Sequence, residues 1–103
     1  MSKFKTIELW EYFFGDKTEV YDYSGKLMKK SACGNPDSRY FPTIDHIRPL
    51  SKGGVDVLDN IVICHGDTNM EKDDSFPHWK VFGKSYHAER IKGSRVAYKI
   101  VAE

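Results

Sequence analysis

Asp45 and His46 stand next to each other in the sequence, directly before a segment that holds one proline and two glycines (49–54). An imidazole has a pKa near neutrality and can take a proton from water, and a carboxylate is an oxygen ligand that divalent cations prefer. Adjacent acid and imidazole groups are common, so the pair alone identifies no site. Its meaning depends on which polar residues follow.

Two asparagines follow the pair at defined distances: Asn60 comes 14 residues after His46, and Asn69 comes nine residues after Asn60. Hydrolysis of a phosphodiester needs a nucleophile at neutral pH, relief of the charge that develops on the phosphate, and help for the departing alkoxide. His46 can act as the base, while Asp45 and Asn69 can offer oxygens to a cation. Such ligands, completed by water and phosphate, suit Mg²⁺, with Mn²⁺ or Ni²⁺ as alternatives, better than Zn²⁺.

Residues 43–74 carry a family resemblance in three segments: IDHIRPLSKGG (44–54), DNIV (59–62) and TNMEKD (68–73). Together they resemble the motif of the HNH endonucleases. The third position of the motif is Asn69, and the spacing is similar to that in the HNH domain of RNA-guided CRISPR nucleases. The resemblance implies a ββα-metal core, also called a His-Me finger, in which two antiparallel strands and one helix hold a single divalent cation.

The resemblance also implies roles for individual residues. His46 and Asn60 form the predicted catalytic set, with His46 as the base and Asn60 bracing the long loop that holds the base in place. An ordinary turn asparagine is the alternative for Asn60. Asp73 is the predicted third metal ligand beside Asp45 and Asn69, because HNH nuclease toxins use a ligand one turn further along the helix.

Two further expectations concern the surroundings of this site. His65 lies four residues before Asn69 and is the alternative third ligand, unless it serves the start of the helix. Three cations, Arg48, Lys52 and Lys72, are predicted to contact the phosphates of DNA. The basic residues of the C-terminal quarter could follow the DNA backbone as well.

The elements that must position these residues alternate between apolar patterns and turn formers. A helix is predicted over 7–14, capped by Thr6 and with a core stripe of Ile7, Trp10, Phe13 and Phe14. Hairpins are predicted at 19–30, around Ser24-Gly25, and at 79–91, around Gly83-Lys84. Strands are predicted at 40–47 and 60–64, a helix at 67–74 and a short C-terminal helix at 96–102. The expected fold is α+β, a single domain over 1–103.

Composition limits the remaining possibilities. The chain has 16 basic and 15 acidic residues, so its net charge of +1 excludes the strongly basic profile of a protein that coats DNA. Its longest apolar runs are far too short for a membrane span, and no signal peptide is recognisable, so we expect a cytoplasmic protein without membrane partners. Because the two cysteines, Cys33 and Cys64, form no Cys-x-x-Cys pair, we expect no structural zinc.

The sequence therefore predicts a metal-dependent endonuclease that hydrolyses DNA. One motif makes one cut, so cleavage of both strands would need a homodimer or two successive cuts, and a partner protein could supply targeting. Two alternatives remain open. One is a catalytically inactive nucleic-acid-binding or regulatory module of the same fold, and the other is a zinc-braced scaffold built on Cys33, Cys64 and histidines.

Overall fold

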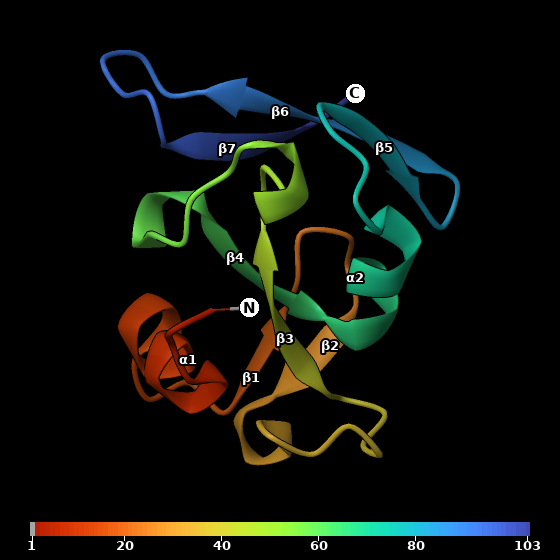
Figure 1. Ribbon diagram of the computed structural model, residues 1–103. Helices are drawn as coiled ribbons and strands as arrows, with labels where there is room; N and C mark the ends of the chain where they lie inside the picture. The colour runs from red at the N-terminus through yellow and green to blue at the C-terminus, as the bar shows by residue number, and fades with distance from the viewer. Residues whose placement is uncertain (1) are drawn as a thin grey trace.

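The computed structural model of the chain describes residues 2–103 and has an α+β architecture (Figure 1). Helix α1 spans Thr6–Phe14 and helix α2 spans Gly66–Lys72. The strands form three antiparallel sheets: β1 (Glu19–Tyr21) with β2 (Leu27–Lys29), β3 (Pro42–His46) with β4 (Ile61–His65), and β5 (His78–Val81) with β6 (Lys84–Arg90) and β7 (Tyr98–Ala102). No helix within residues 2–103 has the length and apolar character needed to cross a membrane.

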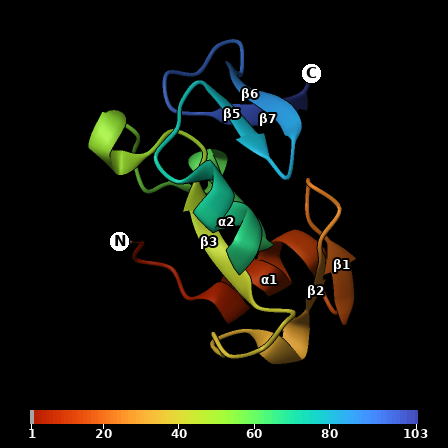
Figure 2. The same cartoon turned by 90° about the vertical axis from the view of Figure 1, so that its right-hand side faces the viewer.

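The middle of the molecule is the β3–β4 pair with helix α2 beside it (Figure 2). β3 and β4 are antiparallel, and their register places Asp45 opposite Val62 and His46 opposite Ile61. Helix α2 begins directly after β4, where His65 Nδ1 accepts a hydrogen bond from the N–H of Asp67 at 3.0 Å. The predicted order of strand, loop, strand and helix is present, with β3 starting two residues later than expected.

A first buried cluster joins helix α1 to the central strands. It consists of Leu9, Trp10, Met28, Ile61 and Ile63. The predicted α1 stripe is only partly correct, because Trp10 is fully buried whereas Ile7 and Phe13 are exposed. The helix ends at Phe14, as predicted, with Gly15 as its C-cap. It begins at Thr6, so the capping position is Lys5 and the expected cap at Thr6 is wrong.

A second buried cluster lies under the three-stranded sheet and contains Ile47, Trp79, Val81, Tyr86 and Tyr98. The short C-terminal helix predicted at 96–102 is wrong. Residues 98–102 form β7, which pairs with β6 from Arg90↔Tyr98 to Tyr86↔Ala102. Tyr98 and the β-branched pair Ile100-Val101 favour a strand, and the free edge of β6 offers the backbone partners that a short helix would lack.

Asp22, in the turn between β1 and β2, ties that hairpin to the central unit. Its Oδ2 accepts hydrogen bonds from the N–H of His65 (2.9 Å) and from Thr68 Oγ1 (2.6 Å). Its Oδ1 accepts from the N–H and Oγ of Ser24 and from the N–H of Lys26. Burial acts to raise the pKa of Asp22, but these hydrogen bonds outweigh it and lower the pKa below 3.8. The junction of β4 and α2 is thereby fixed.

Candidate functional site

Asp45 is a buried carboxylate on β3 with one oxygen left without a hydrogen bond. Its Oδ2 lies 3.3 Å from Lys72 Nζ, an ion-pair distance, but it has no hydrogen-bond partner among residues 2–103. Burial raises the pKa of Asp45, although Lys72 opposes the shift. The Lys72 ammonium thus balances the charge at Oδ2, and Asp45 also lines the pocket beside α2, where its carboxylate could bind a metal ion.

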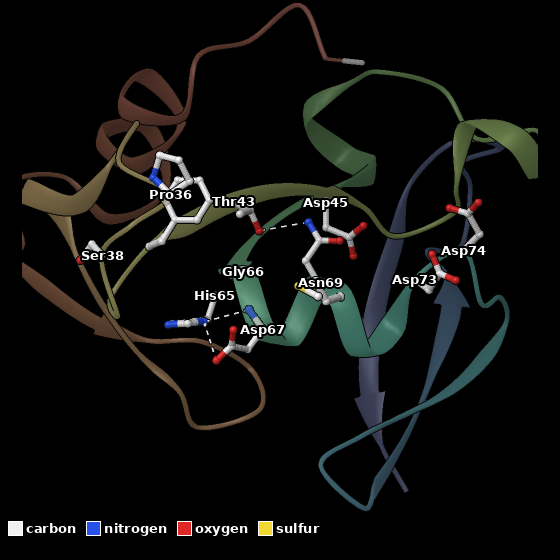
Figure 3. A pocket seen from close by; sticks show the side chains of 12 residues that line it. Pro36, Ser38, Thr43, Asp45, His65, Gly66, Asp67, Asn69, Asp73 and Asp74 are labelled. Atoms are coloured by element: carbon white, nitrogen blue, oxygen red, sulfur yellow. Dashed lines mark hydrogen bonds and ion pairs between the residues drawn. The ribbon is translucent and has the colours of Figure 1, made fainter.

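Asn69 projects from helix α2 toward the same place. Its Nδ2 donates to Thr43 Oγ1 at 3.0 Å and to the carbonyl of Ile44 at 3.4 Å. These bonds turn the amide oxygen toward the side of Asp45 (Figure 3). A carboxylate from β3 and an amide oxygen from α2 therefore lie together, as the sequence predicted.

The two residues line a pocket of about 530 Å³ between β3 and α2. The acidic side chains Asp73 and Asp74 line it where α2 ends (Figure 3). Asp73 is exposed at the C-terminus of α2, with a positive φ of 51°, so the chain turns sharply and brings Asp74 to the pocket as well. The sequence analysis did not identify Asp74 as a site residue. The only feature that could have indicated it was its position directly after Asp73.

His65 also lines this pocket, but both of its ring nitrogens are engaged. Nδ1 accepts from the N–H of Asp67, and Nε2 donates to the carbonyl of Arg39 at 2.6 Å. His65 thus caps helix α2 and has no free lone pair for a metal. The structure thus disfavours His65 as the third ligand, whereas Asp73 lines the pocket and stays a prediction.

His46 is the last residue of β3 and lines an adjoining hollow of about 220 Å³. Asp45, Asp73 and Asp74 line this hollow too, so it continues the larger pocket. Successive strand residues point to opposite faces, and Asp45 and His46 reach one hollow because the strand ends between them and Pro49.

Asp56 holds the imidazole of His46, with 2.7 Å between His46 Nε2 and Asp56 Oδ1. Asp56 also accepts hydrogen bonds from Ser2 Oγ and from the N–H of Lys3, each at 2.7 Å. Burial acts to raise the pKa of Asp56, but the hydrogen bonds from Lys3, His46 and Ser2 outweigh it and lower the pKa to about 2. Sequence reasoning missed Asp56, because an aspartate in a glycine-rich loop is typical of a turn.

Asn60 braces the loop that separates β3 from β4. It is fully buried, its Oδ1 accepts from the N–H of Arg48 at 2.9 Å, and its Nδ2 donates to the carbonyls of Arg48 (3.0 Å) and Val55 (2.9 Å). The loop is drawn so tightly at Gly54 that a Cβ there would lie 1.8 Å from the Arg48 carbonyl oxygen. Asn60 therefore contacts the loop backbone and lines neither the pocket nor the hollow.

A model of the HNH endonuclease family matches residues 23–78, more than half of the 103-residue chain. The chain belongs to the HNH endonuclease family. The match contains the β1–β2 turn, both central strands, helix α2 and every predicted site residue of this HNH chain. Neither a curated protein nor a solved structure matches it significantly.

The three cations predicted to contact DNA are placed differently in this HNH chain. Lys72 is fully buried, and its Nζ lies near Asp45 and 5.0 Å from the ring centre of Trp79. The prediction that Lys72 contacts DNA is wrong, because its side chain is buried where α2 packs against β5. The sequence of α2 alone does not show which of its faces is buried. Arg48 is half-buried, with Nε donating to the Lys52 carbonyl (2.7 Å) and Nη1 to Tyr98 Oη (3.0 Å). Lys52 is exposed.

The two cysteines are free thiols in different surroundings. Cys33 is half-buried and packs against the first buried cluster, whereas Cys64 is buried on β4. Burial raises the pKa of the Cys64 thiol, and Asp45 acts in the same direction. Metal ions bind the thiolate, so this environment disfavours Cys64 as a zinc ligand.

Proposed function

We propose that this HNH-family chain is a metal-dependent endonuclease that hydrolyses DNA phosphodiester bonds through a water activated by His46. The observation that carries the proposal is the placement of the Asp45 carboxylate beside the amide oxygen of Asn69. Both face a pocket that continues into the hollow lined by His46. A cation ligand set and a base in one depression are what phosphodiester hydrolysis requires.

Asp45 and Asn69 are the residues that would hold the divalent cation, with Asp73 able to add a third oxygen from the end of α2. When bound, the cation supplies relief of the phosphate charge and of the charge on the leaving oxygen. Carboxylate and amide oxygens favour Mg²⁺ or Mn²⁺ over softer ions. Lys72 helps to position Asp45 and the backbone of His46. Its Nζ lies 3.3 Å from Asp45 Oδ2 and donates to the His46 carbonyl at 3.3 Å.

His46 is the general base of the proposal, and Asp56 orients it. With a pKa of about 2, Asp56 is ionised throughout the neutral range and accepts the Nε2–H of His46. The Nδ1 lone pair of His46 is then the one that takes a proton from water. No hydrogen bond to another group of the described residues 2–103 occupies Nδ1. A carboxylate that fixes the tautomer of a basic histidine recurs in hydrolytic enzymes.

DNA would approach over the open side of the hollow. Lys52 is exposed on the loop after β3 and is the proposed phosphate contact there. The Arg48 guanidinium is held by Tyr98 and the Lys52 carbonyl, so its contribution to DNA binding is mainly to shape the loop. The proposal therefore assigns phosphate contact to Lys52 and loop geometry to Arg48.

The test is cleavage of supercoiled plasmid with Mg²⁺, Mn²⁺ or Ni²⁺, comparing the unmodified chain with His46→Ala. We expect nicking that EDTA abolishes, and a rate about 10²- to 10⁴-fold lower for His46→Ala, which is the usual contribution of a general base. Gel retardation and Mn²⁺ binding should be unchanged in that variant, and Ser31→Ala, at an exposed position outside the pocket and the hollow, serves as the control.

Equal cleavage rates for the two proteins would remove His46 as the base. A chain that retards DNA but nicks it with none of the three cations would support the non-catalytic binding module instead.

A further inference from the structure

Two histidines and a glutamate, side chains of the types that bind metal ions, lie together on the outer face of the β5–β6–β7 sheet, at the end of the molecule opposite α1 (Figure 1). His78 on β5 and His87 on β6 are direct cross-strand partners. Glu103 follows β7, and its N–H donates to the Ser85 carbonyl at 3.0 Å, which extends the strand pairing by one residue. The antiparallel register therefore brings one residue from each strand or strand end to one place.

The distances within this group suit a metal ion. Glu103 Oε2 lies 3.1 Å from His78 Nδ1 and 3.0 Å from His87 Nδ1, and the ligand atoms all lie within 4.8 Å of one another. Around a tetrahedral zinc with bonds of about 2.0–2.2 Å, neighbouring ligand atoms are about 3.3 Å apart. Only small side-chain adjustments would separate the three atoms to that spacing.

A second carboxylate makes the arrangement more specific. Glu89 Oε2 lies 2.8 Å from His87 Nε2, the nitrogen that points away from Glu103. A metal-bound histidine usually donates its other N–H to a carboxylate, which fixes its tautomer and orientation. A carboxylate faces each ring nitrogen of His87, so a protonated ring can donate to both. The same geometry lets a neutral ring give its Nδ1 lone pair to a metal ion while Nε2–H donates to Glu89.

We propose that His78, His87 and Glu103 form a surface site for a transition-metal ion of the Zn²⁺ type, with Glu89 as the partner that orients His87. Imidazole ligands favour Zn²⁺ and its neighbours over Mg²⁺, so the site differs in chemistry from the Asp45 pocket. The His78 side chain is 72% exposed, which leaves a coordination position open to water. A bound ion would link β5, β6 and the end of β7, and so stabilise the sheet that covers the second buried cluster.

The test is titration of the full chain with Zn²⁺ by calorimetry and with Co²⁺ by visible absorption. Asp45→Asn is the background, so that the pocket between β3 and α2 does not contribute. We expect one Zn²⁺ per chain, d–d absorption bands with Co²⁺, and a rise in Tm on adding Zn²⁺. His87→Gln and Glu103→Gln should abolish all three. Glu19→Gln, on the β1–β2 hairpin, is the matched control and should keep them.

Glu89→Gln gives an intermediate result if the proposal is correct. Loss of an orienting partner typically lowers metal affinity about 10- to 100-fold, so binding should weaken without disappearing. These side chains all lie on the exposed face of the sheet, and circular dichroism will show that each variant is folded. The proposal is overturned if the background protein binds no Zn²⁺, or if His87→Gln and Glu103→Gln bind it as tightly as the background does.

Discussion

At the scale of single residues, two aspartates of the site have opposite environments. Asp45 is buried, one of its oxygens accepts no hydrogen bond, and its pKa is raised. Asp56 accepts three hydrogen bonds, and its pKa is lowered to about 2. The hydrogen-bond donors thus cluster on the carboxylate beside His46, whereas the Asp45 carboxylate forms the ion pair with Lys72 and lines the pocket. Divergent environments of this kind are typical of catalytic acids and bases.

Replacing Asp56 tests whether it acts through His46. In Asp56→Asn the amide cannot hold the His46 imidazolium as a carboxylate does, so we expect kcat for plasmid nicking to fall about 10- to 100-fold. KM and gel retardation should change little, and Asp56→Glu should recover part of the rate. Asp59→Asn, an exposed change in the same loop, is the control. A fall in Tm that accounts for all of the lost activity would make the role of Asp56 purely structural.

The resemblance to the HNH motif predicted that Asp45, His46 and Asn69 come together. In the structure Asp45 and Asn69 line the pocket, and Asp45 and His46 line the adjoining hollow. The function of Asp56 could not be predicted, because it depends on a loop that folds back onto His46. Lys72 was assigned wrongly for a related reason. Its position in the motif places it near the phosphate, but only the packing of α2 against β5 shows that it is buried.

At the scale of elements, the loop between β3 and β4 behaves as one unit because Asn60 fastens it from inside. The side chain satisfies the backbone at both Arg48 and Val55, and the N–H of Ile47 donates to the Asn60 carbonyl at 2.8 Å. The loop in turn carries Asp56 to His46. The bracing that the family resemblance implied for Asn60 is thus a set of backbone contacts, and we propose that Asn60 acts on the site only through the loop.

Asn60→Ala should therefore reduce both stability and activity. It leaves the buried N–H and carbonyl of Arg48 without partners, and each unsatisfied group costs about 1–3 kcal/mol. We expect a lower urea midpoint and slower nicking, with Asp59→Asn, an exposed change in the same loop, close to the unmodified protein. An Asn60→Ala chain that unfolds at the same urea concentration as the unmodified chain would show that the loop is held by other contacts.

Local patterns predicted most elements, including both hairpins and the central strands. The exception is the C-terminal segment, where alanines, a lysine and apolar residues at 96–102 resemble a short helix. Its conformation is decided by the free edge of β6, a partner that no local pattern reveals. The predicted elements were correct where neighbouring residues determine the conformation. The prediction was wrong at 98–102, where pairing with β6 determines it.

At the scale of the whole molecule, Asp22 and Asp56 join segments that are distant in sequence. Asp22 connects the β1–β2 turn to the start of α2, and Asp56 connects the N-terminal segment to the loop after β3. Both carboxyl groups have a lower pKa in the folded protein than the usual 3.8. Their contribution to stability is therefore present above about pH 4 and is lost as the pH falls toward 2.

Urea unfolding measured from pH 7 to pH 2 checks this dependence. We expect the free energy of unfolding of the unmodified chain to fall below about pH 4, because the unfolded state binds more protons. Asp22→Asn should be less stable at pH 7 and show a shallower fall. The pKa of Asp45 is raised in the folded protein, so protonation of Asp45 increases the free energy of unfolding as the pH falls. Asp45 therefore cannot cause the loss of stability. Parallel curves for the two proteins would exclude Asp22 as a source of acid sensitivity.

The most direct test of the account is to locate a bound cation in crystals of the full chain soaked with Mn²⁺, using anomalous scattering. The account predicts a peak in the pocket between β3 and α2, within coordination distance of an Asp45 carboxylate oxygen and the Asn69 amide oxygen. A pocket that stays empty at a Mn²⁺ concentration that supports plasmid cleavage, or a peak only elsewhere, would contradict it.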